Sequence, residues 1–122
     1  MALPATVRDL LARKVGVPVT ARTSPVGVAV APGNRVLKQD PTRIFFLVVN
    51  TGAVPVFLQP AVGTAPQGGS NGVRLEANGG AATTWWEEDG EVTAYEWNGV
   101  ASAAGGVVFV MEVVIDRGGE TL

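Results

Sequence analysis

The sequence contains two long apolar runs that decide its fold, RIFFLVVN at residues 43–50 and VVFVMEVVI at residues 107–115. Both runs are rich in β-branched and aromatic residues, which favour β-strands over helices. The first run is nearly all apolar, and this pattern is typical of a strand that is covered on both faces. Asp40-Pro41 precedes it and Asn50-Thr51-Gly52 follows it, so turn residues bound the strand on each side.

Shorter runs of the same kind fill the rest of the chain. Glycines and prolines separate these runs. The 122 residues include 16 glycines and 8 prolines, together about 20% of the chain, compared with the roughly 12% expected of an average protein. We expect seven to nine short strands, a number typical of a sandwich or a small barrel. The predicted fold class is all-β, a single antiparallel, jelly-roll-like β-sandwich over residues 17–116. A helix or arm over residues 1–16 precedes it, and a tail over residues 117–122 follows it.

Two β-hairpins are expected inside the sandwich. The first would pair residues 43–50 with residues 54–59, and Pro55, which has no N–H to donate, would place the second strand at an edge or a bulge. The other would pair residues 81–87 with residues 91–97 around an Asp89-Gly90 turn, which is a strong hairpin pattern.

The N-terminal segment has the pattern of a short amphipathic helix. Thr6 and Asp9 fit a capping box, which would satisfy the free N–H groups of the first turn. Val7, Leu10 and Leu11 recur at helical spacing. Arg13 and Lys14 fall in the last turn, where the helix dipole favours cations. Because so short a helix is unstable alone, its apolar stripe requires a surface, either on its own body or on a neighbour.

Charge is unevenly distributed along the chain. Residues 1–43 carry seven positive and two negative side chains, whereas residues 44–122 carry two positive and nine negative ones. One interpretation is a basic arm that docks on an acidic neighbour, such as another copy, and the other is a set of solvated charges. The positive residues are scattered and have no interleaved aromatics, so we expect no nucleic-acid binding. We also expect no membrane association, because there is no leader pattern and no run of 18 apolar residues.

The absence of histidine and cysteine excludes much chemistry. Disulfides, zinc sites built on cysteine and histidine, and histidine-based catalytic triads cannot form. Four acidic residues lie close together in the sequence, Glu87, Glu88, Asp89 and Glu91. They could form a solvated turn, a Ca²⁺ site or the carboxylate pair of a hydrolase. A single tight turn favours solvation, so the chain is predicted to be no enzyme and to bind no metal or cofactor.

Four aromatic residues are candidates for core packing, a protein interface or stacking on a sugar, namely Trp85, Trp86, Tyr95 and Trp97. Adjacent residues of a strand point to opposite faces. One of Trp85 and Trp86 is therefore expected in the core and the other on the surface. Only 16% of the residues are charged, which suggests that a partner covers part of the surface.

The order of elements between residues 43 and 115 resembles a known group of proteins. The strand at 43–50 is followed by Thr51-Gly52, a Gly/Ser/Asn loop, Asn78-Gly79-Gly80, an acidic turn, and the valine-rich strand at 107–115. This order is similar to small β-sandwich proteins among the structural proteins of tailed bacteriophages. That group includes capsid decoration (cement) proteins and head and tail accessory proteins.

The resemblance implies a non-enzymatic virion protein that is made in the host cytoplasm and located on the capsid surface. It would bind the major capsid protein of the assembled shell, stabilise that shell, and form a homo-oligomer, as a dimer or a trimer. The alternatives are a carbohydrate-binding module and a tail or fibre accessory protein. The expected partner-binding residues are Val7, Leu10, Leu11, Arg13, Lys14, Trp85 and Trp86.

Overall fold

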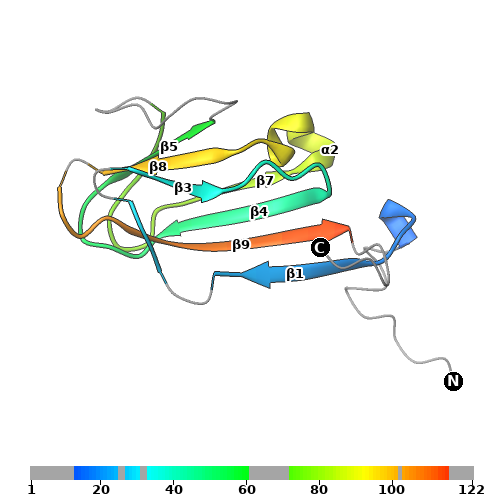
Figure 1. The fold of residues 1–122 in the computed structure, drawn as a ribbon, viewed down its shortest axis with the longest axis horizontal. Helices are drawn as coiled ribbons and strands as arrows, with labels where there is room; N and C mark the ends of the chain where they lie inside the picture. The colour runs from blue at the N-terminus through cyan, green and yellow to red at the C-terminus, as the bar shows by residue number, and fades with distance from the viewer. Residues whose placement is uncertain (1–12, 25–26, 31–32, 61–71, 102, 116–122) are drawn as a thin grey trace, which may run out of the picture.

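The computed structural model describes residues 13–24, 27–30, 33–60, 72–101 and 103–115. Most of these residues form short antiparallel strands, and a helical connection follows the seventh strand (Figure 1). The elements are β1 (Val19–Thr23), β2 (Val28–Ala29), β3 (Asn34–Leu37), β4 (Arg43–Asn50), β5 (Val56–Pro60), β6 (Val73–Leu75), β7 (Ala81–Trp85), α2 (Trp86–Asp89), η1 (Gly90–Ala94), β8 (Trp97–Val100) and β9 (Val107–Ile115).

The strands form two antiparallel sheets, which confirms the predicted all-β sandwich. Sheet A has the order β1-β9-β4-β7, and the short β2 also pairs with β9. Sheet B has the order β3-β8-β5-β6. The two longest apolar runs, β4 and β9, are neighbours at the centre of sheet A. They therefore form the middle of the fold, as expected of the most apolar segments.

The pairing of the strands is nested. The first strand β1 pairs with the last strand β9, β3 pairs with β8, β4 with β7, and β5 with β6. Two further pairings, β4 with β9 and β5 with β8, join these pairs into the two sheets. A double-stranded ribbon rolled up in this way is a jelly roll, in which two four-stranded sheets face each other.

The first predicted hairpin is wrong, because β4 lies in sheet A and β5 lies in sheet B. The buried side chain of Asn50 explains why the chain crosses here. Its amide Nδ2 donates to the carbonyl oxygens of Val54 at 2.8 Å and Leu75 at 3.1 Å, and its Oδ1 accepts the N–H of Gly52. The edge position predicted for the second strand is also wrong, since β5 lies between β8 and β6. Pro55 precedes this strand and takes no place in the ladder.

The second predicted hairpin is wrong as well, because β7 belongs to sheet A and β8 to sheet B. The residues between these two strands form the helical segments α2 and η1. The carboxylate of Asp89 accepts the backbone N–H of Trp85 at 2.8 Å and closes the first turn. Gly90 then adopts a φ of 67° and ends α2, a conformation that glycine reaches without strain. This connection carries the chain from one sheet to the other.

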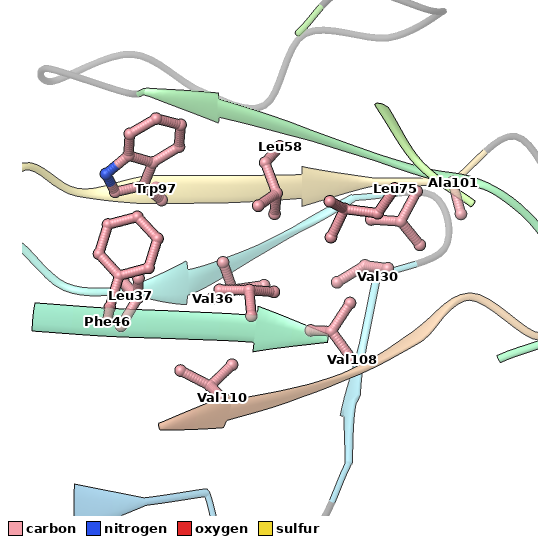
Figure 2. Packing of buried hydrophobic residues seen from close by; sticks show 12 residues of the cluster. Val30, Val36, Leu37, Phe46, Leu58, Leu75, Trp97, Ala101, Val108 and Val110 are labelled. Carbon is pink, nitrogen blue, oxygen red and sulfur yellow. The ribbon is translucent and has the colours of Figure 1, made fainter. Parts of the chain in front are cut away.

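The core fills the space between the sheets (Figure 2). The rings of Phe46 from sheet A and Trp97 from sheet B pack in a T-shaped arrangement, with ring centroids 5.4 Å apart. The indole Nε1 of Trp97 donates to the carbonyl oxygen of Val92 at 3.0 Å, so its polar atom is satisfied despite burial. Trp97 is therefore the core tryptophan, and neither Trp85 nor Trp86 belongs to the core cluster.

Candidate functional site

The predicted partner-binding residues that the structure describes meet at one end of the sandwich. Residues 13–15 are helical, and both Arg13 and Lys14 are exposed. The ammonium Nζ of Lys14 lies 3.1 Å from Oε1 of Glu87 in α2. The indole Nε1 of Trp85 donates to the same carboxylate oxygen at 3.0 Å. The N-terminal segment thus reaches the crossover between the sheets, whereas Val7, Leu10 and Leu11 lie outside the described residues.

The two adjacent tryptophans differ in exposure. Trp85 ends β7 and is half-buried, while Trp86 begins α2 and is 39% exposed. Their ring centroids are 6.1 Å apart and the rings are tilted by 54°. Because Trp86 leaves the strand, the expected strand alternation does not apply to this pair. Trp86 is the surface residue of the two, and Trp85 supports it from the edge of sheet A.

An open pocket of about 660 Å³ lies beside Trp86. The phenolic hydroxyl of Tyr95 donates to Oε1 of Glu91 at 3.1 Å. This hydrogen bond raises the pKa of Tyr95 above its ordinary value, and the negative charge of Glu91 adds to the effect. The pocket therefore combines two aromatic rings, a carboxylate and an apolar wall. Its lining residues are Val15, Gln39, Pro41, Arg43, Ile44, Trp86, Gly90, Glu91, Ala94, Tyr95 and Ile115.

The four clustered acidic residues are exposed, as expected, but they lie on the helical crossover instead of a hairpin turn. Three of the carboxylates hold structural partners. Glu87 binds Lys14 and Trp85, Asp89 accepts the Trp85 N–H, and Glu91 accepts the Tyr95 hydroxyl. In the part of the chain that the structure describes, no group of three or more acidic residues is placed to hold a metal ion.

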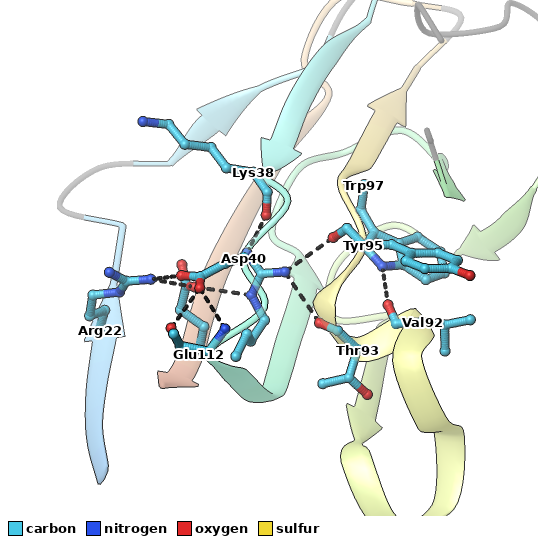
Figure 3. Close-up of polar contacts among 10 residues, drawn as sticks. Arg22, Lys38, Asp40, Val92, Thr93, Tyr95, Trp97 and Glu112 are labelled. Atoms are coloured by element: carbon cyan, nitrogen blue, oxygen red, sulfur yellow. Dashed lines mark hydrogen bonds and ion pairs between the residues drawn. The ribbon is translucent and has the colours of Figure 1, made fainter. Parts of the chain in front are cut away.

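Arg43 is a central residue of this end that the sequence analysis did not single out. Its guanidinium is 1% exposed, and its Nε donates to Oε1 of Glu112 at 3.0 Å. Its other N–H groups donate to the backbone carbonyls of Lys38, Thr93 and Tyr95 (Figure 3). Arg43 thus connects β4 to β9, to the segment after β3 and to η1. It fixes the backbone that carries Tyr95 into the pocket.

Arg22 and Asp40 extend this polar network toward the surface. The Arg22 guanidinium donates to Oδ2 of Asp40 at 2.8 Å and to Oε1 of Glu112 at 2.9 Å. Partial burial opposes the ionisation of Asp40, but hydrogen bonds from Thr42 and the charge of Arg22 outweigh it, so the pKa of Asp40 lies below its ordinary value. Asp40 therefore stays ionised and holds the segment before β4 in place.

The uneven charge distribution is partly compensated within the chain, where four cations share three carboxylates. Four cations of the basic first part pair with carboxylates of the acidic second part, in the pairs Lys14–Glu87, Arg22–Glu112, Arg35–Glu96 and Arg43–Glu112. For these four residues, the structure supplies the acidic partner inside the same chain. The charge pattern therefore gives no separate reason to assign them to a neighbouring molecule.

Among the described residues, no helix is both long and apolar enough to cross a membrane. Comparisons with protein-family models, with curated proteins and with solved structures found no match to this chain.

Proposed function

We propose that this chain is a non-enzymatic structural protein that docks on a larger protein assembly through the Trp86 surface. This surface consists of Lys14, Val15, Trp85, Trp86 and Tyr95 at the end of the sandwich. The observation that carries the proposal is the exposed ring of Trp86 beside an open pocket. Tryptophan and tyrosine in such positions are the residue types that most often dominate the binding energy of protein interfaces.

Two of the three rings of the Trp86 surface are held by hydrogen bonds before any partner binds. Trp85 is held by its hydrogen bond to Glu87, and Tyr95 by its hydrogen bond to Glu91. The backbone of Tyr95 is further fixed by the buried guanidinium of Arg43. Side chains that are already fixed lose less conformational entropy on association, so a pre-ordered aromatic surface favours binding.

The specific assembly we propose is the shell of a tailed bacteriophage, with this chain as a capsid decoration protein. Jelly rolls are common among viral capsid proteins, although lectins share this architecture, so the fold supports the proposal only by analogy. The resemblance of residues 43–115 to virion structural proteins and the absence of histidine and cysteine point the same way. The proposed partner is the major capsid protein, with a location on the capsid surface.

A decoration protein acts by binding its assembled target. If it binds the closed shell and not the free subunits, it stabilises the shell by mass action. A modest affinity at each site is sufficient, because many copies act on one particle. No catalytic group is required for this role.

Mass spectrometry of purified virions whose genome encodes this chain would test the proposal. The measured quantity is the amount of this chain relative to the major capsid protein. A ratio near one, or a simple fraction such as one third, is the result expected of a decoration protein. A few copies per particle would move the chain to the tail or fibre, and absence from the particles would refute the virion proposal.

Binding to empty shells would then test the surface. In co-sedimentation, we expect Trp86→Ala to weaken binding by at least ~30-fold, as for a hot-spot tryptophan. Val73→Ala is the matched control, because Val73 is an exposed apolar residue of β6 in the other sheet, 48% exposed. Equal binding by both variants would exclude the Trp86 surface as the contact.

The second candidate is a carbohydrate-binding module, and the pocket favours it. Rings such as Trp86 and Tyr95 stack on sugars, and the Glu91 carboxylate can accept hydrogen bonds from hydroxyl groups. Trp97 is excluded from this role because it lies in the core. A glycan array in which wild-type protein binds a sugar and Trp86→Ala does not would favour this candidate over the virion protein. An array without hits would count against it.

A further inference from the structure

The outer face of sheet A, which points away from sheet B, is a second surface. The ladder register aligns eleven of its side chains in three rows across the strands. Six of these side chains come from β4 and β9. They are apolar, and each is only half-buried. The rows are Ala21, Val113, Phe45 and Trp85; Thr23, Met111, Leu47 and Thr83; and Phe109, Val49 and Ala81. A further row, Val19 and Ile115, continues the same face, and Val19 is already buried in the single chain.

The outer face of sheet A carries no charged side chain among these eleven residues. An antiparallel sheet that faces water normally alternates apolar residues inward with polar residues outward. The outer face of sheet B is mixed instead, because Arg35, Asn98, Gln59 and Arg74 share it with Phe57 and Val100. Of these four polar residues, Asn98 and Gln59 are buried. Sheet A breaks the rule over both of its central strands, which indicates that its outer face is a contact surface.

We propose that a second copy of this chain packs on the outer face of sheet A, face to face and related by a two-fold axis. Two apolar sheet faces pack against each other at a separation of about 10 Å, as the sheets of a sandwich do. In a two-fold dimer, each surface meets an identical surface. A face that bears charges would then bury some of them without partners, whereas this uncharged face buries none.

The size of the face suits a reversible dimer. Four strands about 4.8 Å apart and three rows about 6.8 Å apart cover roughly 400 Å² in projection. This is about half of the ~800 Å² that each partner buries in a standard stable interface. We therefore expect dimerisation to depend on protein concentration. Trp85 belongs to both this face and the Trp86 surface, so the tests below use Leu47 and Thr83, which lie outside the Trp86 surface and its pocket.

Sedimentation velocity of the wild-type protein over a wide concentration range gives the first test. The expected result is a shift with increasing concentration from the 12.6 kDa monomer to twice that mass. A monomer at every concentration would overturn the proposal. A trimer would also overturn it, because a trimer cannot use a two-fold contact.

Substitutions would assign the contact to this face. Leu47→Glu should weaken the dimer by at least ~100-fold, because it places a charge at the centre of an apolar contact. Val73→Glu introduces the same charge on β6, outside this face, and should leave the dimer unchanged. Thr83→Glu, at an exposed position on the face, replaces Leu47→Glu if circular dichroism shows that the latter is unfolded. A folded face variant that dimerises like the wild type would refute the assignment.

Cysteine trapping offers an independent test, because the chain has no native cysteine. Leu47→Cys lies in the central row of the face, close to the proposed axis, and should form a disulfide-linked dimer on mild oxidation. Arg35→Cys, on the outer face of sheet B, is the control and should remain mostly monomeric. Equal trapping of both variants would show random collision and would contradict a specific contact.

Discussion

Replacing Arg43 by methionine should strongly destabilise the fold. The Arg43 side chain is 1% exposed, pairs with Glu112 and donates to three backbone carbonyls. Methionine fills much of the same volume but leaves these acceptors without their donor. Removing one partner of a buried ion pair costs about 3–5 kcal/mol. Arg22 still binds Glu112 in the variant, so we expect the lower value, about 3 kcal/mol.

Thermal unfolding followed by circular dichroism would measure this effect. For a chain of 122 residues, the entropy of unfolding is about 0.26 kcal/mol/K, so a loss of ~3 kcal/mol lowers Tm by about 12 °C. The matched control is Arg35→Met, which removes an exposed arginine 3.5 Å from Glu96. Such exposed pairs contribute about 0–1 kcal/mol, which corresponds to less than ~4 °C. Equal decreases in Tm for the two variants would refute the central role of Arg43.

Three further predictions concern the core, the acid stability and one turn. Leu58→Ala should cost about 2–5 kcal/mol in urea unfolding, because Leu58 is 1% exposed in the core, whereas Val73→Ala at an exposed site should cost less than ~0.5 kcal/mol. Asp40 has a lowered pKa in the folded state, so its contribution is complete above its unfolded pKa and is lost as the pH falls through its folded pKa. Asp40→Asn should therefore lower Tm near neutral pH, and the Tm of this variant should fall less than that of the wild type when the pH is lowered. An acid dependence of Tm equal to that of the wild type would contradict this. Gly52→Ala should cost about 1–3 kcal/mol, because its Cβ would lie 2.2 Å from the Gly105 carbonyl oxygen; an unchanged Tm would show that the turn relaxes.

The candidate site was only partly predictable from the sequence. Residue type identified Trp86 and Lys14, because an aromatic pair and a basic helix end are recognisable in any chain. The pocket beside Trp86 was not predictable, since its lining comes from segments as distant in the chain as Val15 and Ile115. Arg43 was counted among the positive charges, but its burial depends on Glu112 and on three backbone carbonyls from two other segments.

The sequence by itself determined the strand content and the fold class. The runs at 43–50 and 107–115 form β4 and β9 with the expected bounds. Their β-branched and aromatic residues each favour a strand, and consecutive residues of this kind favour it together. Only the tertiary structure decided which strands pair. Turn residues show that the chain reverses, but not whether it returns in the same sheet or crosses to the other. At Asn50 this choice depended on hydrogen bonds to Val54 and Leu75, and contacts between residues 25 positions apart leave no local pattern in the sequence.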